Sequence, residues 1–171
     1  MSQIKKVIDQ NKLPSEDFLR PFKLFGVSPT FNLDPTWLDD SFLQKQIALH
    51  PDQFIKKPQE QKKAEKAFAD IVQAYEVLKD PKLRAKMLFQ QKGLWPVPHD
   101  PDILEELLEI EEDFARGTLS YLEIEEKEAT AFEALAHAFE DNDWHAAGTA
   151  FMVWNALLRM QKSRENPPPM Q

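Results

Sequence analysis

The residues in this sequence best suited to polar chemistry are His50 and Asp52, which flank Pro51. A neutral histidine ring offers one hydrogen-bond donor and one acceptor, and an aspartate offers a carboxylate that can accept from an arginine of another protein. Pro51 restricts the backbone between them, so less conformational entropy is lost on binding. The tripeptide therefore favours a binding loop. The structural alternative is that Asp52 caps a turn and His50 closes the C-terminal end of a helix.

The other polar residues argue against catalysis and against a metal site. The four histidines, at positions 50, 99, 137 and 145, lack the spacing of metal ligands, and the chain has no cysteine. Its four glycines are not clustered, so the sequence has no phosphate-binding loop. Paired glutamates could supply catalytic carboxylates, but on an acidic helical surface such pairs are usually solvated. We expect no enzyme activity, no metal and no cofactor.

Two predicted helices position the His50-Pro51-Asp52 loop. Residues 35–49 follow Asp34, a suitable N-cap, and the helix ends because Pro51 cannot continue it. Residues 59–79 form a second amphipathic helix. Apolar residues recur along one face of the first helix at Leu38, Phe42 and Leu49, and of the second at Ala64, Phe68, Ile71, Val72, Tyr75 and Leu78. Packed antiparallel, the two helices would leave the loop exposed at their tip.

Residues 21–93 resemble a J-domain, and the resemblance rests on four motifs. These are KLFGV at 23–27, HPDQF at 50–54, AYEVL at 74–78 and DPKLRA at 80–85. Further helices are predicted at 101–116, 119–140 and 144–161, each followed by glycine, a polar turn or proline. A J-domain followed by a small acidic three-helix module resembles the HscB family, the dedicated co-chaperones of iron-sulfur cluster assembly.

This resemblance implies an all-α, L-shaped molecule. We expect an N-terminal extension (1–20), the J-domain (21–93), a linker (94–100), an acidic three-helix bundle (101–161) and a disordered tail (162–171). The family implies two partners. One is an HscA/DnaK-type chaperone ATPase that the His50-Pro51-Asp52 loop stimulates, and the other is an IscU-type iron-sulfur scaffold bound by the bundle. Two alternatives stay open: a J-domain co-chaperone for another client, and a helical interaction protein without co-chaperone activity.

The chaperone-binding surface departs from the family pattern. The helix before the loop usually carries several basic residues, but here it has only Lys45, and Gln53 stands where a lysine commonly follows the tripeptide. Electrostatic steering should therefore be weaker. Lysines on the far side of the loop could compensate, or they could form an ordinary solvated helix face. These are Lys56, Lys57, Lys62, Lys63 and Lys66.

A client-binding strip follows from helix geometry over residues 101–116. At about 100° per residue, the stripe that a bundle would bury consists of Ile103, Leu107, Ile110 and Phe114. Leu104 and Leu108 fall outside it, beside Glu105, Glu109 and Glu112. Apolar residues edged by carboxylates are typical of a protein-binding site. Alternatively, a wide bundle buries both faces, or the two leucines meet the J-domain.

On the last helix, the HscB resemblance implies that one hydrophobic residue joins the scaffold site. The nearest matches are Trp154 and Leu157.

Charge separates the two halves of the chain. Residues 1–97 hold 16 Lys and Arg against 12 Asp and Glu, whereas residues 98–171 hold 5 against 17. The acidic half should repel nucleic acid and attract a basic partner. The chain has no apolar run of membrane-spanning length and no signal-peptide core at its start. We expect a monomeric cytoplasmic protein that binds neither nucleic acid nor membranes.

Overall fold

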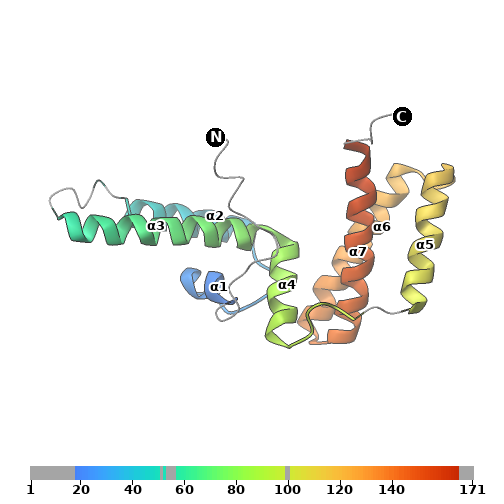
Figure 1. The fold of residues 1–171 in the computed structure, drawn as a ribbon, viewed down its shortest axis with the longest axis horizontal. Coiled ribbons are helices and arrows are strands. Elements are labelled where there is room, and N and C mark those ends of the chain that lie inside the picture. Colours follow the sequence, from blue (N-terminus) through green and yellow to red (C-terminus); the bar gives the residue numbers. More distant parts are fainter. Residues whose placement is uncertain (1–17, 51, 53–56, 99–100, 166–171) are drawn as a thin grey trace. The chain divides into compact units, whose positions relative to one another are not determined.

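The computed structural model describes residues 18–50, 52, 57–98 and 101–165, and Figure 1 shows its fold. Within those ranges the chain contains helices and no strand, so the all-α prediction is confirmed. It forms two compact units, Met1–Gly93 and Leu94–Gln171. None of the described helices is long and apolar enough to cross a membrane. The helices are α1 (Arg20–Phe25), α2 (Pro35–Ala48), α3 (Pro58–Lys79), α4 (Pro81–Gln91), α5 (Pro101–Arg116), α6 (Tyr121–Glu140) and α7 (Trp144–Glu165).

In the first unit, α3 is the central element, and α1, α2 and α4 all pack against it. Figure 1 shows α2 and α3 side by side and antiparallel. The core of this unit is apolar, and the predicted stripes contribute Leu38, Ile71 and Leu78 to it. It contains Phe22, Phe25, Leu38, Ile71, Ala74, Val77, Leu78 and Met87.

Helix α2 begins where the sequence predicts. The Asp34 carboxylate accepts the backbone N–H of Thr36 at 2.8 Å, and Pro35 occupies the first helical position. Tyr75 then fixes α3 against α2. Its hydroxyl donates to the Asp39 carboxylate at 2.8 Å, and its ring stacks on Phe42 with centroids 4.1 Å apart.

Helix α4, which the sequence analysis did not assign, explains the DPKLRA motif. Asp80 caps it by accepting the backbone N–H of Lys82 at 2.7 Å. The buried Arg84 guanidinium donates to the Phe31 carbonyl at 2.9 Å and also to the Leu78 carbonyl. Burial lowers the pKa of Arg84, and the nearby Asp80 carboxylate opposes that shift. Arg84 thus joins α4 to the end of α3 and to the segment before α2.

In the second unit, α6 and α7 form a closely packed antiparallel pair, and α5 packs on α7 (Figure 1). The turn between α6 and α7 is tight, with Asn142 at a φ of 58°. Ile124, Leu135 and Leu157 are fully buried where the helices meet. The unit is therefore a helical hairpin with a third helix attached to one of its members.

The boundaries in the second unit differ slightly from those predicted. Helix α6 begins at Tyr121, not 119, because Ser120 forms a capping box with Glu123. The Ser120 N–H and hydroxyl donate to the Glu123 carboxylate and lower the pKa of that carboxyl. Helix α7 runs to Glu165, past the predicted end at 161.

The segment predicted as a linker contacts α7. The Trp95 ring meets Phe151 edge-on at 5.9 Å between centroids, and Val97 lies close to Gly148. Residues 99–100 lie outside the described part of the chain. So do residues 1–17 and 166–171, which hold most of the predicted extension and tail.

Candidate functional sites

His50 and Asp52 lie just beyond the C-terminal end of α2, with their side chains 55% and 77% exposed. The backbone N–H of Asp52 is 3.4 Å from His50 Nδ1, and Asp52 Oδ2 is 3.6 Å from the same nitrogen. Nδ1 accepts the N–H when it carries no proton, and it donates to the carboxylate when it carries one. Both contacts are long, so the imidazole and the carboxylate are accessible to a partner. Pro51 and Gln53 lie outside the described residues.

The predicted contact residue Lys45 is directed toward the core side of α2. Its ammonium lies over the Phe25 ring, 5.7 Å from the centroid, and its side chain is half-buried. On α3, Lys62, Lys63 and Lys66 are exposed, whereas Lys57 pairs with Glu60 at 3.1 Å. Lys56 lies outside the described residues. Of the two helices next to the loop, α3 and not α2 therefore carries the solvent-exposed basic groups.

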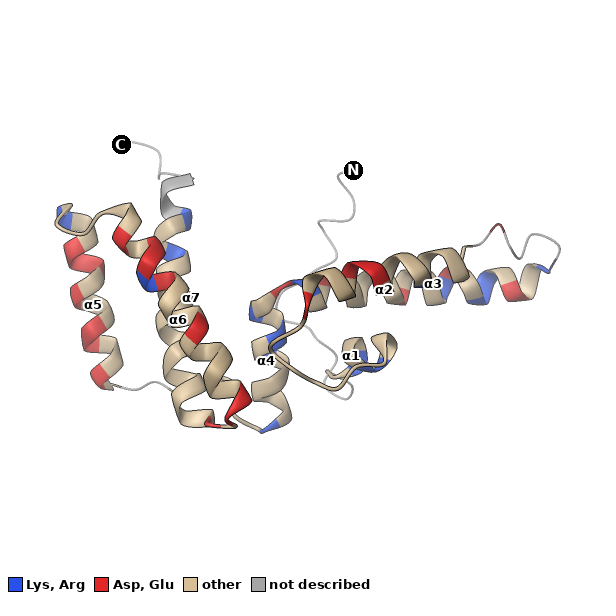
Figure 2. Ribbon diagram, turned by 180° about the vertical axis from the view of Figure 1, so that it is seen from behind, with Lys and Arg blue, Asp and Glu red and all other residues tan. Residues whose placement is uncertain are grey.

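Helix α5 separates its leucines as the geometry predicts. Leu107 is buried, whereas Leu104 is 38% and Leu108 is 59% exposed. Glu105, Glu109 and Glu112 are exposed, and Figure 2 shows acidic residues along the length of α5. We call Leu104, Leu108 and these three glutamates the α5 strip. Glu112 also lies 3.8 Å from Arg116, an exposed pair that contributes little to stability.

Trp154 and Leu157 do not form part of that surface, because both side chains are buried. The Trp154 indole N–H donates to the Glu128 carboxylate of α6, and its ring lies 5.3 Å from that of Phe132. Leu157 is fully buried in the same helical pair. Neither side chain is exposed to a partner in this structure, and their role in scaffold binding stays a prediction.

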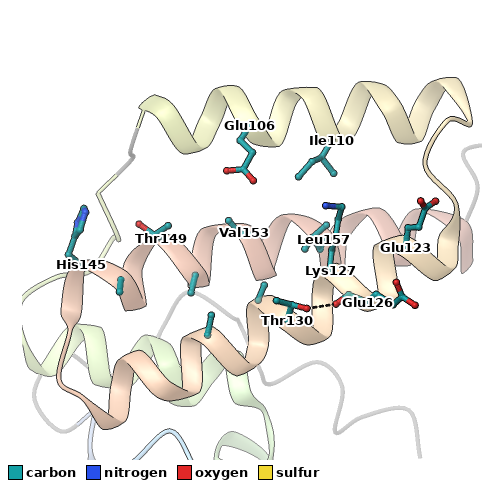
Figure 3. A pocket seen from close by; sticks show the side chains of 14 residues that line it. Glu106, Ile110, Glu123, Glu126, Lys127, Thr130, His145, Thr149, Val153 and Leu157 are labelled. Atoms are coloured by element: carbon teal, nitrogen blue, oxygen red, sulfur yellow. Dashed lines mark hydrogen bonds between the residues drawn. The ribbon is translucent and has the colours of Figure 1, made fainter.

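A groove that the sequence analysis missed lies between α5 and the α6–α7 pair. It has a volume of about 820 Å³ and a largely apolar lining. Figure 3 shows Glu106 and Ile110 of α5 on one wall, facing Val153 and Leu157 of α7. His145 lies at one end, and Glu123 and Lys127 lie at the other. The groove depends on how three helices are spaced, which the periodicity of one helix does not report.

The described residues contain no group of three or more His, Cys, Asp or Glu side chains placed to hold a metal ion. The two units instead present an exposed histidine and aspartate at a helix end, and an apolar strip edged by carboxylates.

Comparisons with known proteins agree on one family. A DnaJ domain model matches residues 20–87. The chain is 37% identical over 98 residues to the co-chaperone protein HscB homolog of Vibrio vulnificus, which covers 54% of this chain and 57% of that relative. It is 27% identical over 164 residues to the Bordetella pertussis HscB homolog, which covers 88% of this chain and 96% of that relative.

Solved structures extend the likeness to the fold. Chaperone HscB from Vibrio cholerae matches with a TM-score of 0.66 and 25% identity, over 85% of this chain and 94% of that one. Human co-chaperone protein HscB matches with a TM-score of 0.65 and 23% identity, over 92% and 86%. This chain therefore resembles HscB co-chaperones in sequence and in fold. It spans 57% of the length of the Vibrio vulnificus HscB relative in that match.

Helix α2 carries a single basic residue, Lys45, and it is held against Phe25. The position of Lys45 depends on a contact between residues twenty apart, so the sequence alone did not reveal it.

Proposed function

We propose that this protein is a cytoplasmic co-chaperone of iron-sulfur cluster assembly. It binds an IscU-type scaffold through the α5 strip and delivers that scaffold to an HscA/DnaK-type chaperone. The loop that carries His50, Pro51 and Asp52 stimulates ATP hydrolysis by the chaperone. The protein itself performs no covalent chemistry.

The observation that carries the proposal on the client side is the solvent exposure of Leu104 and Leu108 beside the buried Leu107. Exposed leucines one helical turn apart form an apolar contact surface, and the carboxylates around them favour a partner with basic groups. Residues 98–171 as a whole carry a net negative charge, which attracts a basic partner from a longer distance.

On the chaperone side, support comes from the DnaJ domain match and the exposure of His50 and Asp52. An accessible carboxylate can accept a charge-assisted hydrogen bond from an arginine of the ATPase. The imidazole adds a second polar contact within the same loop. The two groups together can favour one conformation of the chaperone, which is how a partner without catalytic groups accelerates hydrolysis.

Two measurements on the purified protein test the proposal. The first is single-turnover ATP hydrolysis by an HscA-type chaperone, which the wild-type protein should accelerate and His50→Gln should not. The second is calorimetric titration with an IscU-type scaffold, which should give saturable binding that is lost in Leu104→Ala/Leu108→Ala. Stimulation without scaffold binding would favour a J-domain co-chaperone for another client. Absence of both activities would leave a helical interaction protein.

A further inference from the structure

The exposed apolar residues of the first unit are concentrated on one helix. Among the described residues of this unit, the large apolar side chains with most of their surface in solvent are Leu43 and Ile47, at 56% and 60%. Trp37, also on α2, is exposed to a lesser degree. No exposed large apolar side chain occurs in the described parts of α1, α3 or α4. Such local concentration distinguishes a contact surface from the scattered apolar residues of any protein surface.

Leu43 and Ile47 share the face of α2 that points away from the core. At about 100° per residue they lie about 40° apart, and they lie about 140° and 180° around the helix from the buried Leu38. Asp40 falls on the same face one turn earlier. We call Asp40, Leu43 and Ile47 the α2 outer face. Lys45 is directed to the other side, over Phe25, so this face carries no basic group.

The α2 outer face runs directly into the His50-Asp52 loop. The Ile47 carbonyl accepts the backbone N–H of His50 at 3.4 Å, so both residues belong to one final helical turn. From Leu43 to His50 the helix rises only about 10 Å. A specific protein interface buries about 800 Å² per partner and cannot be confined to two residues of a loop. A chaperone that contacts His50 and Asp52 must therefore cover a neighbouring surface.

We infer that the α2 outer face docks on the same chaperone ATPase through apolar contacts, in place of the basic contacts usual for the family. The inference rests on the proposed function. It requires an apolar patch on the chaperone opposite Leu43 and Ile47, with a donor opposite Asp40. Because burial of apolar surface is insensitive to ionic screening, docking through this face depends weakly on salt.

The competing surface is the lysine-bearing face of α3. Lys62 and Lys66 are exposed there, but Glu65 lies between them and Lys57 is already paired with Glu60. Mixed charges of this kind are usual on a solvated helix, and each exposed pair contributes little. The leucine and isoleucine of α2 lose an unfavourable exposure to water on docking, which the α3 lysines do not.

The test is a titration of single-turnover ATP hydrolysis by an HscA-type chaperone. Leu43→Ala/Ile47→Ala should raise the concentration for half-maximal stimulation by about tenfold or more, as expected when two central apolar contacts are truncated. The maximal rate at saturation should persist, because His50 and Asp52 are intact. Leu43→Met/Ile47→Leu keeps the apolar area and should restore docking to within about threefold. Thermal melts check that each variant is folded.

Salt and a matched lysine variant separate the two surfaces. For the wild-type protein, raising KCl from about 50 to about 300 mM should change the half-maximal concentration by less than about threefold. Lys62→Ala/Lys66→Ala should change it by less than about twofold. Strong salt dependence, or a tenfold loss in the lysine variant, would show that α3 is the docking surface and overturn the inference.

Two further outcomes distinguish failure of the proposed function from failure of the inference. If the wild-type protein does not accelerate hydrolysis at all, the proposed function fails before the inference is reached. If it does, and Leu43→Ala/Ile47→Ala titrates like wild type, the inference alone is wrong. Sedimentation gives the remaining control, because a wild-type dimer that this variant dissociates would assign the α2 outer face to a second copy of the chain.

Discussion

Helices α2 and α5 use the same apolar spacing in different electrostatic settings. Each has one buried leucine, Leu38 or Leu107, and each presents a pair of aliphatic side chains to solvent one turn apart. On α5 the pair is Leu104 and Leu108, surrounded by three exposed glutamates, whereas on α2 the pair Leu43 and Ile47 has only Asp40 on its face. Figure 2 shows the contrast, with acidic residues along all of α5 and along only the first part of α2.

This difference indicates that apolar area and charge contribute differently to binding at the two surfaces. Apolar area provides most of the affinity of a contact, while surrounding charge controls the association rate and the choice of partner. The α5 strip should therefore select a basic partner and respond to salt, and the α2 outer face should do neither. The following predictions test the comparison, from the largest expected effect to the smallest.

The largest effect on function should come from the loop at the end of α2. Asp52→Asn removes the negative charge from an exposed carboxylate, and loss of a charge-assisted contact costs about 1.5–3 kcal/mol. Productive docking on the chaperone should weaken by about tenfold or more. Chaperone ATPase titrations measure this, and His50→Gln should abolish stimulation while the melting temperature is unchanged. Unaltered stimulation by Asp52→Asn would show that the loop is not part of the chaperone-binding site.

The largest effect on stability should be in the second unit. Leu107 is buried, so Leu107→Ala leaves a cavity and should cost about 2–5 kcal/mol of unfolding free energy. Urea denaturation followed by circular dichroism measures it. A cost near zero would mean that α5 is not held by its buried stripe, and the distinction between its two faces would lose its basis.

The exposed pair on α5 should behave in the opposite way. Leu104→Ala/Leu108→Ala should weaken scaffold binding by about 2 kcal/mol or more and leave the melting temperature nearly unchanged, because exposed apolar residues contribute to association rather than to folding. Calorimetric titration and thermal melts measure the two quantities on the same samples. Large destabilisation with affinity preserved in the folded fraction would show that the pair is core and that the client binds elsewhere.

The smallest effect should come from the carboxylates of the α5 strip. Glu109→Gln/Glu112→Gln should slow scaffold association and flatten its salt dependence, with a change of less than about 1 kcal/mol in affinity at physiological ionic strength. Stopped-flow association at several salt concentrations measures this. An unchanged salt slope would locate the basic-partner recognition in other acidic residues of the second unit.

Sequence patterns predicted the structural features that depend on a single helix and its capping residues. The α2 start at Asp34 and Pro35 and the separation of Leu107 from Leu108 follow from local periodicity. Helix α4 was missed because Arg84 and Lys86 interrupt its apolar pattern, although carbonyls distant in sequence satisfy the Arg84 guanidinium. The scaffold role of Trp154 and Leu157 came from the family resemblance and not from periodicity, and both side chains are buried in the structure.

The central claim is that one chain couples an iron-sulfur scaffold to a chaperone ATPase, with α5 and the His50-Pro51-Asp52 loop acting in separate units. The most direct measurement is the single-turnover ATPase rate of an HscA-type chaperone with this protein, the scaffold, or both. With this protein and the scaffold both present, the fold-stimulation of the ATPase rate should exceed the product of the two separate fold-stimulations. Leu104→Ala/Leu108→Ala should remove that excess and retain the stimulation by the co-chaperone alone. Equal rates with and without scaffold in the wild-type protein would contradict the coupling.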